Sequence, residues 1–147
     1  MKIWVDADAC PKAVKEILFR VAERTEISVT LVANLPLRLP GSPFISLIQV
    51  GSGSDIADDE IANQCQAGDL IITADIPLAA RVVEKGAQAL DPRGTMYDQN
   101  NIGQILSMRN FMDELRGSGV ETGGPSGFGQ KEKFKFANAL DKFIAQK

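Results

Sequence analysis

The chain has 147 residues, of which 44% are hydrophobic and 24% are charged, a size and composition typical of one globular domain. It contains no histidine, which excludes a Ser-His-Asp triad, an imidazole acid or base, and a zinc site with a histidine ligand. The formal net charge is −3, with −5 over residues 1–102 and +2 over residues 103–147, so charge alone does not indicate a nucleic-acid-binding protein.

Strand and helix signals alternate through the first ninety residues. Short apolar runs rich in β-branched residues predict strands, and the segments between them carry helical spacing or Gly- and Pro-bearing loops. Pro11 takes the favoured first position of the first helix, while Gly68 and Gly86 end the next two. The predicted strands are residues 2–5, 27–32, 44–50, 69–73 and 87–90, and the predicted helices are residues 11–22, 55–66 and 76–85.

The alternation predicts a single α/β domain over residues 1–147, a three-layer sandwich with a mostly parallel central sheet. Residues 100–147 read as a C-terminal helical extension with a Gly-rich loop: one helix near 102–115, a loop over 117–129 and a final helix over 131–144. No apolar stretch approaches the roughly 18 residues of a membrane helix, and the chain starts with a strand-like segment instead of a signal peptide. Cys10 and Cys65 are far apart and are expected to be reduced thiols. We therefore expect a cytoplasmic protein with no membrane partner.

Carboxylates follow the predicted strands. Asp6 closes the first apolar run, and because the carboxyl ends of parallel strands meet at one edge of a sheet, acids from distant segments gather there. Such like charges repel, and burial strengthens the repulsion. A hard cation such as Mg²⁺ or Mn²⁺ would relieve it and activate a water for attack on phosphorus. The acids placed at this edge are Asp6, Asp8, Asp55, Asp58, Asp59, Asp75 and Asp91. Those predicted to bind the cation and act in catalysis are Asp6, Asp8, Asp58 and Asp75.

Most of these acids also have a purely structural interpretation. Asp8 can help to cap the helix that begins at Pro11, Asp55 and Asp58 form a capping-box-like pair, and Asp75 is a suitable N-cap. Asp91 precedes a proline and fits a turn. Capping accounts neither for Asp6, which closes an apolar strand, nor for the convergence of the set, and for these reasons we favour a metal site.

The C-terminal segment carries the residues expected to meet a substrate. Backbone N–H groups of Gly123 and Gly124 could bind a phosphate, and Arg109, Lys131 and Lys133 could contact a nucleic-acid backbone. The structural alternatives are a flexible connection and a solvated helix face.

Three segments resemble the YaiI/YqxD family of bacterial proteins: residues 5–11, residues 68–79 and residues 123–125. The resemblance extends over nearly the whole chain, and the family's fold is considered similar to PIN-like nucleases, which hold Mg²⁺ or Mn²⁺ with acids and hydrolyse RNA or DNA. It implies that Asp6 is the first-strand acid and that Asp75 is the acid after the fourth strand. Asp58 would be the helix acid, where a PIN domain usually has Glu, with Asp8 or Asp91 in support.

The residues and the resemblance together predict a metal-dependent nuclease that acts on phosphodiester bonds, with RNA as the favoured substrate. Two alternatives stay open. Asp6-x-Asp8 after a strand also resembles haloacid-dehalogenase-like phosphatases, with Asp6 as nucleophile and Asp8 as acid, although Cys10 stands where Thr or Val is usual and the chain is short for that fold. The other alternative is a non-catalytic protein that binds RNA or a nucleotide.

Overall fold

A six-stranded sheet forms the centre of the structure, a computed structural model that describes residues 1–53, 55–117 and 128–146. The strand order is β3-β2-β1-β4-β5-β6, in which the first five strands are parallel and β6 runs antiparallel to β5. The strands are β1 (Ile3–Asp6), β2 (Val29–Ala33), β3 (Ile45–Gln49), β4 (Leu70–Ile72), β5 (Gln88–Leu90) and β6 (Met96–Tyr97). The predicted mostly parallel α/β fold is confirmed.

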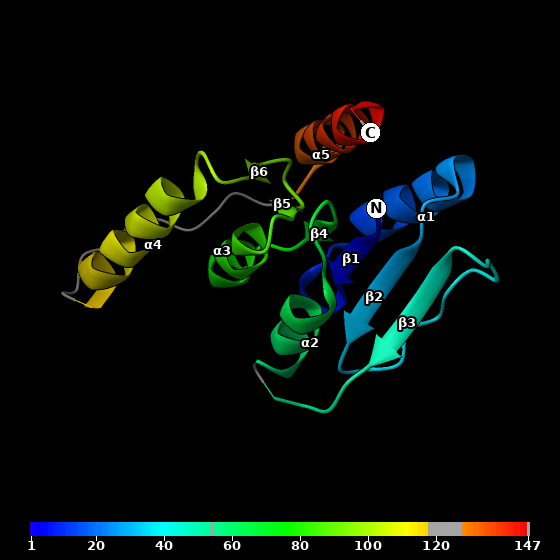
Figure 1. Cartoon of the computed structure of the whole chain (residues 1–147), viewed down its shortest axis with the longest axis horizontal. Helices are drawn as coiled ribbons and strands as arrows, with labels where there is room; N and C mark the ends of the chain where they lie inside the picture. Colours follow the sequence, from blue (N-terminus) through cyan, green and yellow to red (C-terminus); the bar gives the residue numbers. More distant parts are fainter. Residues whose placement is uncertain (54, 118–127, 147) are drawn as a thin grey trace.

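Helices cover both faces of this sheet and complete a three-layer arrangement (Figure 1). One face carries α1 (Lys12–Thr25) and α5 (Gln130–Ala145), and the other carries α2 (Ile56–Gln64) and α3 (Ile76–Glu84). The remaining helix, α4 (Ile102–Gly117), packs against α3 and extends away from the sheet. No helix in the described ranges is long and apolar enough to cross a membrane.

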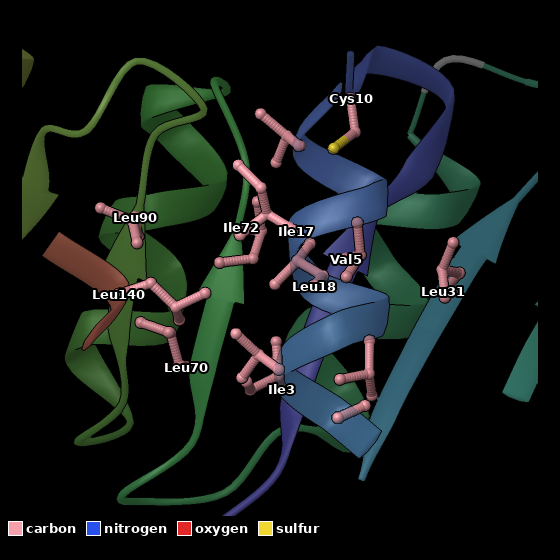
Figure 2. Close-up of a cluster of buried hydrophobic side chains, with 14 of the residues drawn as sticks. Ile3, Val5, Cys10, Ile17, Leu18, Leu31, Leu70, Ile72, Leu90 and Leu140 are labelled. Carbon is pink, nitrogen blue, oxygen red and sulfur yellow. The ribbon is translucent and has the colours of Figure 1, made fainter. Parts of the chain in front are cut away.

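The central strands are buried on both faces because helices cover each of them. All four residues of β1 are buried, with Ile3 and Val5 in the core beneath α1, and Trp4 in the core beneath α2 and α3. Figure 2 shows Ile17 and Leu18 of α1 among the side chains of β1, β2 and β4. The residues of α1 that are buried are those with the predicted helical spacing: Val14, Ile17, Leu18, Val21 and Ala22.

The C-terminal helix α5 contributes to this core. Phe136 and Leu140 are fully buried in the same cluster as Ile3 of β1. Near the start of α5, the backbone comes so close to Gly94 that a Cβ there would lie 2.8 Å from the carbonyl carbon of Lys135. The predicted C-terminal extension therefore helps to hold the sheet, and its first turns lie beside the turn between β5 and β6.

The structure differs from the sequence prediction at two short segments. A 3-10 helix, η1 (Ala7–Ala9), separates β1 from α1, so Pro11 is the N-cap of α1 and not its first helical residue. The two-residue strand β6 was not predicted, because so short a strand has no periodicity to detect. Within the predicted Gly-rich loop, residues 118–127 lie outside the described residues.

Candidate functional site

An acidic cavity of about 440 Å³ lies at the carboxyl ends of β1 and β4, beside the first turn of α2. Its lining residues are Asp6, Asp8, Ala9, Asn34, Gly53, Ala57, Asp58 and Asp75. The structure thus brings together all four acids predicted to bind a cation, although they come from segments up to 69 residues apart. No lysine or arginine of the described residues lines this cavity.

Asp6 occupies the last position of β1 and is only 9% exposed. Its Oδ2 accepts a hydrogen bond of 3.1 Å from the Thr73 hydroxyl. Burial raises the pKa of the Asp6 carboxyl above its ordinary value, this hydrogen bond partly counteracts the effect, and the neighbouring Asp75 and Asp8 raise the pKa further. Asp6 is therefore held in a place where its negative charge costs free energy.

The Thr73 hydroxyl links two of the cavity's acids. It donates to Asp6 Oδ2 and accepts the backbone N–H of Asp75 at 3.0 Å, and the residue itself is 1% exposed. One buried hydroxyl therefore fixes the end of β1 relative to the segment that follows β4. Thr73 was not predicted to belong to the acidic site, because its position opposite Asp6 follows only from the pairing of β1 with β4.

Asp58 and Asp75 interact directly in the cavity, through their charges and a side-chain hydrogen bond. The pKa of Asp58 is raised to about 6, mainly by burial, then by the charges of Asp75 and Asp6, by a hydrogen bond with Asp75 and by the charge of Asp55. The Asp58 carboxyl therefore holds its proton more tightly than an ordinary aspartic acid does and loses it near pH 6. Asp75 Oδ1 also accepts the Leu78 N–H at 2.9 Å, so the predicted N-cap of α3 is confirmed.

Asp8 and Asn34 lie side by side at the rim. Asp8 is exposed in η1, and its Oδ2 accepts the Asn34 backbone N–H at 2.8 Å. The predicted role of Asp8 as a cap for the following helix is wrong, because the carboxylate bonds to the loop after β2 instead. The side-chain oxygen of Asn34 is buried and has no hydrogen-bond partner among the described residues. Asn34 comes two residues after the predicted strand 27–32, so the rule that gathers acids at the carboxyl edge would also have found it if neutral amides had been included.

The oxygen ligands of the cavity fit a hydrated Mg²⁺ or Mn²⁺ better than a dehydrated ion. The cavity offers carboxylate oxygens and the unpaired amide oxygen of Asn34, which are the hard ligands that these cations prefer. However, no three Asp, Glu, Cys or His side chains within the described ranges are placed to hold one metal ion by themselves. Mg²⁺ commonly keeps several waters and is held by one or two carboxylates, and the paired Asp58 and Asp75 suit that mode.

The three other acids at this edge do not line the cavity. Asp91 holds the turn before β6, accepting the Arg93 N–H at 2.6 Å and the Tyr97 hydroxyl at 3.3 Å, so it gives the site no direct support. Asp59 forms an exposed ion pair of 2.8 Å with Arg81. Asp55 is the N-cap residue of α2, but its side chain makes no capping hydrogen bond, so the predicted capping box there is wrong.

The cations predicted to bind substrate lie away from the acidic cavity. Lys131 and Lys133 are in the first turn of α5, beside the turn that follows β5, and neither lines the cavity. Arg109 lies on α4, where it forms an ion pair of 3.3 Å with Asp113. Gly123 and Gly124 lie outside the described residues.

Comparison with known proteins gives a consistent result over the whole length. A family model described as "Uncharacterized BCR, YaiI/YqxD family" matches residues 4–146. The UPF0178 proteins of Maridesulfovibrio salexigens and Shewanella loihica are each 60% identical over 146 residues, which is 99% of this chain and 97% of theirs. The UPF0178 protein of Pseudoalteromonas atlantica is 59% identical over 147 residues, the full length of both chains. No solved structure matches.

Proposed function

The chain belongs to the YaiI/YqxD family, and we propose that its acidic cavity hydrolyses phosphodiester bonds in a nucleic acid, with RNA as the favoured substrate and Mg²⁺ or Mn²⁺ as the cofactor. The observation that carries the proposal is the convergence of Asp6, Asp58 and Asp75, from three separate elements, on one cavity without a lining cation. Capping accounts for one oxygen of Asp75 and for none of Asp6 or Asp58.

The protonation of the cavity supports a cation as its natural occupant. The pKa values of Asp6 and Asp58 are both raised, so each carboxyl holds a proton more tightly than an ordinary aspartic acid does. A divalent cation held by these carboxylates would relieve the repulsion among them and would displace those protons. Metal affinity should therefore rise with pH through the range near pH 6.

The chain's own residues divide the work at the cavity. Asp58 and Asp75 are the acids best placed to hold a hydrated cation. Asp6 adds a further negative charge to the lining of the cavity, and its Oδ2 accepts a hydrogen bond from Thr73. A bound cation supplies a water of lowered pKa and offsets the charge of the phosphate. Once a cation has displaced its proton, the Asp58 carboxylate could accept the proton that the attacking water loses, because its pKa is raised to about 6.

The test compares metal-dependent cleavage by the wild type, Asp6→Asn and Asp59→Asn. Asp6→Asn keeps the shape of the side chain and removes its charge, so we expect cleavage to fall by about 100-fold or more while folding is retained. Asp59→Asn is the matched control, because Asp59 is in the same turn as Asp58 but pairs with Arg81 outside the cavity. Equal cleavage by wild type and Asp6→Asn, or equal Mn²⁺ binding by calorimetry, would reject the proposal.

Two further measurements separate this proposal from the phosphatase and the non-catalytic binding protein. A phosphatase that uses Asp6 as nucleophile would form an aspartyl-phosphate, which a phosphate mimic can trap and mass spectrometry can detect. Asp8 would then act as the acid, but its Oδ2 already accepts an N–H from Asn34, which is the behaviour of an acceptor. Binding of RNA without turnover in any metal would instead identify a non-catalytic RNA- or nucleotide-binding protein.

A further inference from the structure

A second cavity is lined by residues of the loop that follows β2, the loop whose first residue, Asn34, lines the acidic cavity. It has a volume of about 460 Å³ and lies between α1 and residues 37–40. We call it the α1 groove and define it by Lys12, Lys15, Phe19, Leu37, Arg38 and Leu39. It continues into a further cavity of about 450 Å³, which shares Phe19 and Pro40 with it, so the hollow runs along α1 for several turns.

The rim of the α1 groove carries an uncompensated positive charge. The charged residues that line the groove are three cations, Lys12, Lys15 and Arg38, and one acid, Glu16. None of these three cations forms an ion pair with any described residue. By contrast, Arg24, Arg81, Arg93 and Arg109 each pair with an acid. A surface of this kind favours an anionic ligand.

The floor of the groove is apolar. Phe19, Leu37 and Leu39 are partly buried and pack against the core beneath α1, so each presents an apolar surface that no other described part of the chain covers fully. An apolar floor with an aromatic ring and a basic rim matches one ligand chemistry well: a base packs on the apolar side chains while phosphates meet the cations.

The α1 groove is continuous with the acidic cavity along the chain. Asn34, which lines the acidic cavity and binds Asp8 through its N–H, begins the loop whose later residues form one wall of the groove. Lys12 follows Asp8 by four residues, a span of at most about 14 Å. A few nucleotides of a strand whose phosphate lies at the acids would therefore extend into the groove.

We infer that the α1 groove binds the single-stranded nucleic acid that the acidic cavity cleaves, with bases on Phe19 and Leu37 and phosphates at Lys12, Lys15 and Arg38. The inference rests on the proposed function for the identity of the ligand. It moves the main substrate contacts from the predicted Lys131 and Lys133 to the helix that directly follows the acidic segment.

The test is fluorescence anisotropy of a labelled single-stranded RNA, with a DNA strand of the same sequence in parallel, at several salt concentrations in metal-free buffer. The double variant Lys12→Gln/Lys15→Gln should bind at least about tenfold more weakly at low salt. The slope of log K against log salt should become shallower by about 0.7 for each phosphate that the variant no longer neutralises. Phe19→Leu keeps an apolar side chain but removes the ring, and should weaken binding by about fivefold or more.

The matched control is Lys131→Gln/Lys133→Gln, which makes the same change of charge on α5. It should bind as the wild type does; a weakening equal to that of Lys12→Gln/Lys15→Gln would overturn the inference. So would an unchanged salt slope in Lys12→Gln/Lys15→Gln, or binding to anionic phospholipid vesicles with none to either oligonucleotide.

Hydrolysis of bis(p-nitrophenyl) phosphate distinguishes failure of the groove from failure of the proposed function. This small phosphodiester needs the acidic cavity alone, so the wild type should hydrolyse it whether or not the groove binds an oligonucleotide. Hydrolysis without oligonucleotide binding would refute substrate binding by the α1 groove and would still support hydrolysis by the acidic cavity. Binding that depends on Lys12 and Lys15, without any metal-dependent hydrolysis, would support nucleic-acid binding by the α1 groove and refute the proposed nuclease activity.

Discussion

Replacing Asp58 with asparagine should stabilise the metal-free protein at pH 7 and change its stability much less near pH 4. The reason is the environment of the Asp58 carboxyl, whose pKa is raised from 3.8 to about 6 by burial, then by Asp75 and Asp6, by a hydrogen bond with Asp75 and by Asp55. A raised pKa in a carboxyl group means that the folded state binds the proton more tightly than the unfolded state. Stability therefore falls as the pH rises from about 4 to 6, and the loss is complete at pH 7.

The magnitude follows from the same pKa. For a fully shielded group, a pKa of about 6 in place of 3.8 corresponds to about 3 kcal/mol. Asp58 is only half-buried, so solvent screening reduces the expected gain from Asp58→Asn to about 1–2 kcal/mol at pH 7. Near pH 4 the unfolded chain is also largely protonated, and the gain should be below about 0.5 kcal/mol.

Urea unfolding at pH 4 and pH 7 measures both values, followed by the fluorescence of Trp4, the only tryptophan, which is 2% exposed. Asp59→Asn is the control and should lose at most about 1 kcal/mol at either pH, since it removes only an exposed ion pair. Added Mg²⁺ should stabilise the wild type at pH 7 and stabilise Asp58→Asn less. Destabilisation of Asp58→Asn at pH 7, or an equal gain at both pH values, would refute the reasoning.

Three further substitutions test contacts at the carboxyl edge of the sheet, after β4 and β5, and at the opposite edge, before β4. Thr73→Val removes the donor to Asp6 and should cost about 1–3 kcal/mol in urea unfolding and lower metal-dependent cleavage, while Thr73→Ser should restore both. Gly94→Ala, at φ +98° and with the α5 backbone within 2.9 Å of the new Cβ, should cost more than about 2 kcal/mol. Gly68→Ala, at φ +89° in open space, is its control and should cost only about 1 kcal/mol. Asp69→Asn should lose about 2 kcal/mol or more, because one acceptor oxygen of a buried carboxylate becomes a donor.

The sheet could be predicted from the sequence because its strands are short, apolar and separated by segments with clear helical spacing. The rule that parallel strands end at one edge was then sufficient to gather Asp6, Asp58 and Asp75, which the structure places around one cavity. The same rule failed for Asp91, because it fixes the edge of the sheet but not the position along that edge. Strand β5 is two places from β1, and local bonds to Arg93 and Tyr97 keep the Asp91 carboxylate in its own turn.

Other parts of the site depend on contacts between distant segments. Thr73 meets Asp6 only through the pairing of β1 with β4, and Asn34 meets Asp8 only because η1 turns the chain toward the end of β2. The α1 groove requires residues 37–40 to lie against α1, and nothing in the spacing of a loop with three prolines indicates that contact. These features could not be predicted because each one depends on the packing of an irregular segment.

A second aspartate buried beside the same sheet has very different surroundings from those of Asp6. Asp69, before β4, is 7% exposed, and its two oxygens accept three donors: the backbone N–H groups of Lys2 and Gln66, and the indole N–H of Trp4. Asp6 is 9% exposed, yet it accepts one hydroxyl and faces further carboxylates. A carboxylate buried for structure is surrounded by donors, as Asp69 is. Asp6 is buried to the same extent among other acids, which destabilises the fold, and this contrast with Asp69 supports the proposal that the cavity binds a cation.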